Sequence, residues 1–154
     1  MTDERQTELD GPARYRFAVD SIARSQELWI VESDENTLTL ESEAGVELLP
    51  VWPTSTSAAE SVTDQERIEK FKPVKRTLSD WLDRSTKALV REQVMVGVFP
   101  NKQRRCPVVR PERFARDLKM AIRGVVFQAN DLRVLRQNVL KKNSPKKTSS
   151  RKRS

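Results

Sequence analysis

The sequence predicts an α+β fold, in which a small, mostly antiparallel sheet carries packed helices in a single domain. Three observations support this prediction. The chain has 154 residues, which suits one domain. Strand-like patterns lie close together over residues 27–52, with links too short for parallel pairing. Helical patterns come before, between and after the predicted strands.

The first elements along the chain are one helix and three strands. Asp10 can cap a helix whose first turn suits Pro12, and the apolar face of this helix ends near Ser25. In the second strand Leu38 and Leu40 alternate with polar residues, which is typical of a sheet with one face on a core. The predicted strands cover residues 27–32, 37–42 and 46–52.

The later elements mix short strands with amphipathic helices. Residues 93–99 are apolar on both faces, as in a central strand, whereas Pro73 limits residues 71–76 to an edge strand. A further strand is predicted over residues 105–109, and helices over 56–63 and 78–89. The last long helix begins at Pro111, with Phe114, Leu118, Ala121, Ile122 and Val125 in one apolar register.

Composition divides the chain into four parts. Residues 1–10 read as a disordered leader and residues 11–122 as the α+β domain. Residues 123–140 are expected to form a helical extension, because Leu132, Leu135 and Val139 recur at i, i+3 and i+7. Residues 141–154 read as a disordered basic tail. The extension could pack on its own domain or on a second chain.

Charge is distributed unevenly along the chain. The formal net charge is +7, yet residues 1–100 hold 19 acidic and 12 basic residues. Residues 101–140 and residues 141–154 each carry a net charge of +7. No basic residue lies between Arg24 and Arg67, where ten acidic residues occur. This acidic segment is either a surface for a basic partner or the solvated face of a sheet.

Several functions are excluded or disfavoured by residue content. The chain has no histidine, which removes His-dependent triads and His-ligated metal sites, and no cofactor is expected. Its one cysteine, Cys106, cannot form an internal disulfide and is read as a strand residue, although neighbouring arginines could activate it. The acidic start is not a signal peptide, and no stretch suits a bilayer. We therefore expect a cytoplasmic protein without membrane contact.

Several segments of the sequence form a recognisable series, namely RYRFAVDSIARSQELWIV, LLPVWPTSTSAAE, LSDWLDRSTKAL, and QVMVGVFP followed by VVRPERFARDL. In these segments the chain resembles the bacterial family called domain of unknown function 2750. The resemblance covers about residues 12–120 and implies a fold of alternating strands and helices, but no catalytic residues. The rhythm of strands and helices is also similar, at the level of the fold, to the N-terminal module of SseB-like proteins.

Two groups of residues are candidates for binding. Trp52 and Pro53 at the end of one strand, and Phe99 at the end of another, are expected to form the rim of a shared, partly exposed groove. Basic residues on the last long helix, namely Arg113, Arg116, Lys119 and Arg123, could extend a polyanion-binding stripe into the tail. The tail would contribute Lys141, Lys142, Lys146, Lys147, Arg151, Lys152 and Arg153.

The sequence leaves three functions open. The first is a non-catalytic protein-interaction or adaptor module, with another protein as partner. The second is binding of nucleic acid or another polyanion, through the tail and the basic region before it. An enzyme of unknown type is the third. A separate possibility is that the basic tail rests on the acidic hairpin of the same chain. The oligomeric state is left open.

Overall fold

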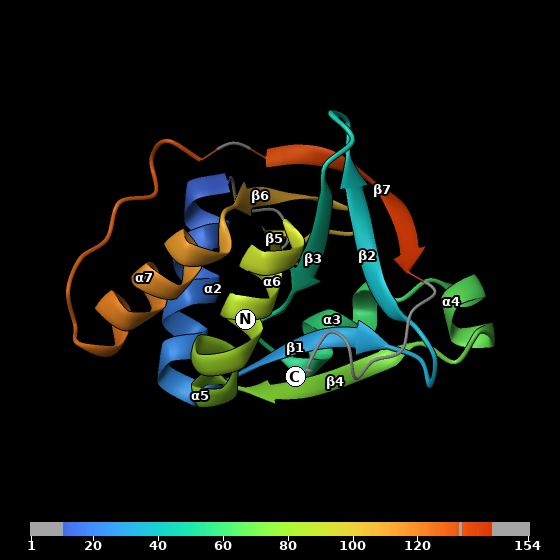
Figure 1. Cartoon of the computed structure of the whole chain (residues 1–154), viewed down its shortest axis with the longest axis horizontal. Helices are drawn as coiled ribbons and strands as arrows, with labels where there is room; N and C mark the ends of the chain where they lie inside the picture. Colours follow the sequence, from blue (N-terminus) through green and yellow to red (C-terminus); the bar gives the residue numbers. More distant parts are fainter. Residues whose placement is uncertain (1–10, 133, 143–154) are drawn as a thin grey trace.

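The computed structural model describes residues 11–132 and, for the backbone alone, residues 134–142. It confirms the α+β fold, in which several helices gather at one end of the sheet and a short helix lies at the opposite end (Figure 1). The helices are α2 (Gly11–Ser25), α3 (Ser55–Ser61), α4 (Asp64–Ile68), α5 (Leu78–Asp80), the π-helical turn η1 (Trp81–Ser85), α6 (Thr86–Glu92) and α7 (Pro111–Ile122). The strands are β1 (Glu27–Glu32), β2 (Thr37–Ser42), β3 (Glu47–Val51), β4 (Lys72–Thr77), β5 (Met95–Val98), β6 (Arg105–Val109) and β7 (Val134–Lys142).

The seven strands form one sheet that closes on itself over part of its width. The order is β3-β5-β6-β7-β2-β1-β4, and β3 also pairs with β2. Strands β2, β3, β5, β6 and β7 therefore make a closed ring of pairings, from which β1 and β4 extend. Among the pairings of the described strands, only that of β3 with β5 is parallel. As predicted, β5 is internal and β4 lies at the edge.

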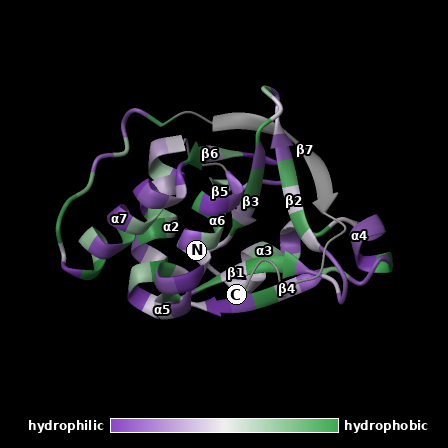
Figure 2. Ribbon diagram, in the orientation of Figure 1, coloured by the Kyte–Doolittle hydropathy of each residue, from purple (hydrophilic) through white to green (hydrophobic). Residues whose placement is uncertain are grey.

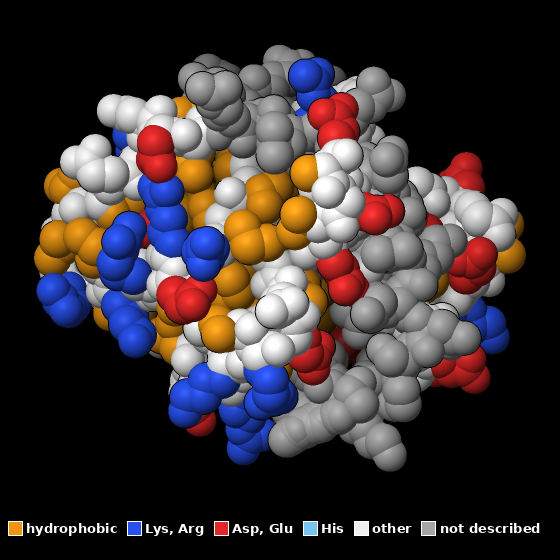
Figure 3. Space-filling model, turned by 45° about the horizontal axis from the view of Figure 1, so that its top comes forward, with side chains coloured by type: hydrophobic (Ala, Val, Ile, Leu, Met, Phe, Trp, Pro, Cys, Tyr) orange, Lys and Arg blue, Asp and Glu red, His pale blue; other side chains and the backbone are white. Residues whose placement is uncertain are grey.

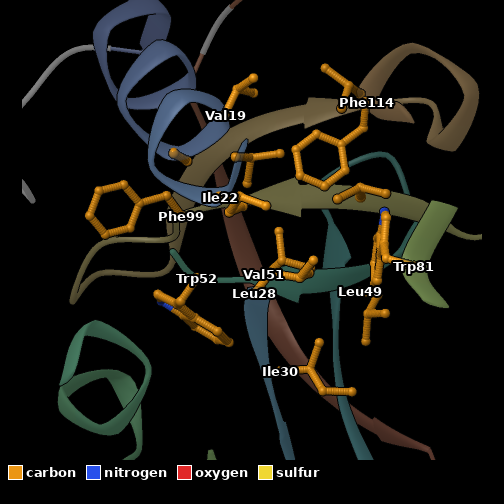
Figure 4. Packing of buried hydrophobic residues seen from close by; sticks show 14 of the residues in the cluster. Val19, Ile22, Leu28, Ile30, Leu49, Val51, Trp52, Trp81, Phe99 and Phe114 are labelled. Carbon is orange, nitrogen blue, oxygen red and sulfur yellow. The ribbon is translucent and has the colours of Figure 1, made fainter. Parts of the chain in front are cut away.

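The main core lies between the sheet and the helices (Figure 4). Helix α2 contributes its face with Tyr15, Val19 and Ile22, and α7 contributes Phe114 and Leu118. These side chains are buried because each helix repeats its apolar residues at intervals of three and four. The core also contains Trp81, as its place on the apolar helix face predicts.

The helix expected over residues 78–89 is present, but its middle turn is wider than an α-helix. The chain runs through α5, η1 and α6 without a break. The hydroxyl of Thr86 donates to the carbonyl oxygen of Trp81 at 2.9 Å, five residues earlier. This side-chain bond accompanies the π-type turn, a feature often found near functional sites. The helix ends at Gln93, which adopts a left-handed conformation with φ 61°.

The predicted helical extension over residues 123–140 is wrong. The chain leaves α7 at Gly124, in a left-handed turn (φ 73°), and continues without regular structure to Leu132. The backbone then forms strand β7 between β2 and β6. Two turns of apolar pattern did not fix a helix, because Leu135 and Val139 also suit a strand that faces Cys106 and Leu40. Membership of the sheet therefore extends beyond residue 122.

The first residues of the predicted basic tail lie in strand β7. Lys141 and Lys142, assigned to the tail by composition, belong to β7 and pair with Leu38 and Thr37 of β2. The start of the basic tail thus lies beside the acidic hairpin. The leader, residues 1–10, and the tail positions Lys146, Lys147, Arg151, Lys152 and Arg153 lie outside the described residues. No helix in the described parts of the chain has the length and apolar character needed to cross a membrane.

Candidate interaction surface

The groove expected around Trp52 and Phe99 is not present at the surface. Trp52 is 0% exposed, Phe99 is 1% exposed, and Pro53 is also buried. The two strand ends do meet, because the amide of Phe99 donates to the carbonyl oxygen of Val51 at 2.7 Å. They meet inside the core, however, as Figure 4 shows. The prediction of a partly exposed rim is therefore wrong.

Helix α2 is the reason why Phe99 is buried. Phe99 has a left-handed backbone (φ 59°), and its ring stacks on Phe17 with centroids 5.8 Å apart. Arg14, which is also on α2, places its guanidinium 3.9 Å from the centroid of this ring. Its Nε and Nη2 both donate to the carbonyl oxygen of Phe99, Nε at 2.8 Å. Burial lowers the pKa of Arg14 to about 10, so this cation keeps its charge at neutral pH.

Trp52 is buried by its neighbours in the sheet. Its backbone forms a bridge to Trp29 of β1, with two hydrogen bonds of 2.9 Å. Its indole nitrogen donates to the carbonyl oxygen of Pro100 at 3.2 Å. The indole N–H is thus hydrogen-bonded inside the protein and does not have to donate to water or to a binding partner. Both residues thus stabilise the fold.

The exposed face of α7 carries a basic stripe instead. Glu112, Arg116, Lys119 and Arg123 recur at i, i+4, i+7 and i+11, and all four are exposed. The opposite face holds Phe114, Ala115, Asp117 and Leu118, which are buried. One acid and three basic residues give this face a net positive charge. Three members of this stripe are among the basic residues expected from sequence to form a polyanion-binding surface.

A groove of about 500 Å³ runs along this stripe. Thr86 of α6 forms one wall, and α7 forms the other. Apolar atoms of Ala115 and Met120 lie between the charged side chains. The residues that line it are Thr86, Glu112, Ala115, Arg116, Lys119, Met120 and Arg123. A second hollow of about 280 Å³, between α2 and the end of α7, is lined by Arg16, Asp20, Ala121, Gly124, Val125, Val126 and Phe127.

Apolar side chains are exposed at the end of α7 and in the second hollow. Ile122, Val125 and Val126 are 45%, 39% and 85% exposed. They make up half of the exposed large apolar residues among the described side chains. Figure 2 shows hydrophobic residues at the end of α7 and at the start of the connection that follows. The sequence placed Ile122 and Val125 in one apolar register with Phe114 and Leu118, but the helix ends at Ile122, Val125 lies beyond it, and both side chains are exposed.

We call the groove, the second hollow and these three residues the α7 surface. In Figure 3, Lys and Arg side chains with hydrophobic ones among them gather on the side of the molecule that carries α7, and acidic side chains gather on the other side. The α7 surface therefore combines apolar contact area with positive charge. This combination is typical of sites that bind acidic, partly apolar ligands.

Polar contacts hold the connection after α7 against the helices. Arg113 forms two hydrogen bonds to the carboxylate of Asp131, at 2.7 and 2.9 Å, and a third to the carbonyl oxygen of Gln128 at 3.0 Å. Arg16 of α2 donates to the side chain of Asn130 at 3.0 Å. The hydrogen bond from Arg113 lowers the pKa of Asp131 to about 2. Arg113 is therefore engaged and does not belong to the basic stripe.

Beneath the connection, a buried acid joins α2 to α7. The hydroxyl of Tyr15 donates to Asp117 at 2.6 Å, and neither residue is exposed. Nε of Arg113 lies 3.5 Å from the same carboxylate. Burial and the bond to Asp117 raise the pKa of Tyr15 well above its ordinary value. The base of the α7 surface is thus fixed to the core.

Other candidates from the sequence have structural roles in the described residues. Two members of the acidic segment are buried in ion pairs of 2.8 Å, Glu32 with Arg76 and Glu66 with Arg104. Cys106 is buried in β6, as expected of a strand residue. In the parts of the chain that the structure describes, no three His, Cys, Asp or Glu side chains gather in a way that could hold a metal ion.

Fold and site define a small α+β protein, with a strand ring on one side and a basic, apolar surface on the other. The model of the family "Protein of unknown function (DUF2750)" matches residues 15–118, and the chain belongs to this family. The match contains β1 to β6 and most of α7, but neither Lys119, Arg123 nor β7. The resemblance noted from sequence is thereby confirmed, while the likeness to SseB-like modules stays a prediction. No curated protein and no solved structure matches the chain.

Proposed function

We propose that this protein is a non-catalytic protein-interaction module that binds an acidic segment of a partner protein on the α7 surface. The observation that carries the proposal is the groove between α6 and α7, where Arg116, Lys119 and Arg123 surround apolar atoms of Ala115 and Met120. A ligand that fills this groove buries apolar area and meets positive charge at the same time. The single, buried cysteine is consistent with a cytoplasmic location.

The exposed apolar residues favour a protein over a nucleic acid. Val126 is 85% exposed, and Ile122, four residues earlier in the chain, is 45% exposed. Such side chains gain energy from apolar contacts on a peptide but not from a phosphate backbone. Binding of single strands usually relies on exposed aromatic rings, and none is among the exposed large apolar residues of the described chain. Polyanion binding by the basic residues is therefore the competing outcome of the test.

The test is an NMR titration of the full chain with a synthetic amphipathic helical peptide that has Glu on one face and Leu on the other. We expect amide shifts to concentrate on α7, Thr86 and residues 122–126. The variant Lys119→Glu/Arg123→Glu should weaken binding by about tenfold or more, because each charge contributes roughly 1 kcal/mol at a binding site. Shifts centred elsewhere would overturn the proposal.

A matched variant controls for net charge. Lys72→Glu/Lys102→Glu also reverses two exposed basic residues, neither of which lines the groove or the second hollow. It should leave the affinity within about twofold. A third variant, Val126→Ser, separates the two kinds of ligand. It should weaken the binding of the peptide and leave the binding of an oligo(dT) strand unchanged. If oligo(dT) binds more tightly than the peptide, and Lys119→Glu/Arg123→Glu abolishes that binding, polyanion binding replaces the proposal.

A further inference from the structure

Strand β7 fills a slot that the rest of the sheet leaves between β2 and β6. It pairs with six residues of β2, from Thr37 to Ser42, and with three of β6, from Arg105 to Pro107. Both pairings are antiparallel. Without β7, the ring of strands would be open and two edges would face each other. Open edges of this kind bind added strands through their backbone groups.

The ring encloses a small core of its own. It consists of Leu40, Leu48 and Cys106, with Met95 and Val108 packed against them, and it is separate from the main core. Packing inside the ring is tight, because a methyl group at Gly97 would overlap the side chain of Leu48. The register sets Leu135 opposite Cys106 and Val139 opposite Leu40. Leu135 and Val139 of β7 therefore stand at register positions next to two members of this small core.

Charge also suits the pairing of β7 with β2. The segment between Arg24 and Arg67, which contains β2, has ten acidic residues and no basic one. Strand β7 has Arg136, Lys141 and Lys142 and no acidic residue. A strand with this sequence is thus complementary in sign of charge to the acidic segment on the β2 side of the slot, whereas on the β6 side Arg136 stands opposite Arg105, a pair of like charges. The β7 strand of a second copy is complementary to the same degree.

The chain before β7 favours exchange between copies. The connection is fixed to the helices by Asp131, and the amide of Leu132 donates to the carbonyl oxygen of Ala129 at 3.1 Å. Strand β7 begins only two residues later, at Val134. A short link between a fixed anchor and a strand favours swapping, because the strand can swing out while the anchor stays in place.

We propose that the slot between β2 and β6 is a binding site for β7 of a second copy of this chain, so that two copies exchange their β7 strands. Each ring in such a dimer contains the same pairs as in the monomer, and the α7 surface of each copy stays accessible. The inference does not rest on the proposed function, because it concerns a different face of the molecule.

The test uses cysteines placed at one register pair. Glu41 of β2 stands opposite Asn138 of β7, at a separation that a disulfide can bridge. One chain carries Glu41→Cys and the other carries Asn138→Cys, and the two are refolded together from urea at high protein concentration. We expect a disulfide-linked heterodimer on non-reducing gels, with the joined peptides identified by mass. The double variant Glu41→Cys/Asn138→Cys, refolded at low concentration, should close the disulfide within one chain.

Each other result counts against exchange. If the double variant closes its disulfide and the mixture gives no heterodimer, the strand does not exchange. Failure of the double variant to close would contradict the pairing of β7 with β2 itself. As a matched control, Glu43→Cys lies in the exposed turn after β2 and has no partner in the β7 register. Equal cross-linking of this variant with Asn138→Cys would show random collision in place of exchange.

Discussion

At the sheet end of the molecule, Arg104 and Glu66 form an ion pair closed to water, whereas at the helical end a series of charges runs from the core to the surface. The side chains of Arg104 and Glu66 are 8% and 3% exposed. In the helical series, Asp117 is 0%, Arg113 is 23% and Asp131 is 63% exposed. The same chemistry is thus buried completely in one region and graded in the other.

The two regions support different parts of the chain. Arg104, in a left-handed conformation (φ 62°), reaches from the turn before β6 to the carbonyl oxygen of Ser61 and to Glu66. It joins the turn before β6 to helices α3 and α4 in the interior. The helical series ends at the connection that carries Val126, part of the α7 surface. We therefore expect changes in the closed pair to affect the whole fold, and changes at the outer end of the series to act locally.

The largest effect is expected from Glu66→Gln. This change keeps the shape and the capping contact to Thr63, but it leaves the charge of Arg104 buried without its partner. Loss of one partner of a buried pair costs about 3–5 kcal/mol, which urea unfolding can measure. The control is Asp64→Asn in the same helix, whose carboxylate is 97% exposed and pairs with Arg67 at the surface. It should cost at most about 0.5 kcal/mol. Equal losses in the two variants would contradict the comparison.

A smaller effect is expected at the inner end of the helical series. Tyr15→Phe keeps the ring contacts to Phe114 and Phe127 and removes the hydrogen bond to Asp117. A bond to a buried charged group contributes about 1.5–3 kcal/mol, so the free energy of unfolding should fall by that amount. No loss of stability would mean that Asp117 is satisfied by its arginines alone.

Tyr15 also predicts how stability depends on pH. Its pKa is raised in the folded state, so the native protein keeps the phenol neutral above pH 10, where an unfolded chain has lost the proton. The stabilisation is complete below the unfolded pKa and is lost as the pH rises further. Because Tyr15 is the one tyrosine of the chain, ultraviolet absorbance follows it alone. Tyrosinate should appear only with unfolding at high pH, and near pH 10 in urea. Titration of the folded protein near pH 10 would contradict the buried bond.

The sequence predicts the individual helices and strands better than it predicts how they pair and pack. The strands at 27–32, 37–42 and 105–109 match β1, β2 and β6 to the residue, because local alternation and turn residues define them. The parallel pairing of β3 with β5 and the insertion of β7 depend on contacts between distant segments. No local pattern contains that information.

The same limit applies to the candidate site. Aromatic residues at strand ends can be exposed or buried, and in this chain α2 covers Phe99 through Arg14 and Phe17. The basic stripe of α7 was visible in the sequence, since its residues recur at helical spacing. The groove beside it was not, because it exists only where Thr86 of α6 faces that stripe. Spacing predicts one face of a helix, and packing decides what lies opposite.

The smallest effect is expected at the outer end of the series, from Asp131→Asn. The pKa of Asp131 is lowered to about 2, so its bond to Arg113 holds above the ordinary carboxyl pKa and is lost as the pH falls through about 2. The amide substitution removes this charge at neutral pH. We expect faster hydrogen exchange in residues 124–132 without a measurable change in global unfolding, because Asp131 is exposed and screened by water.

The Asp131→Asn variant also connects the series to binding. If Val126 contributes to the ligand site, a looser connection should lower the affinity for the acidic peptide even though the fold is intact. The reason is that the peptide must then order residues 124–132 when it binds. The control Asp83→Asn removes another exposed carboxylate, that of η1, which pairs with Lys87 one helical turn later in α6. It should change neither hydrogen exchange in residues 124–132 nor the affinity for the acidic peptide. A drop in global stability as large as that of Tyr15→Phe would mean that the outer and inner ends of the series act as one unit, and that the gradation in burial has no energetic counterpart.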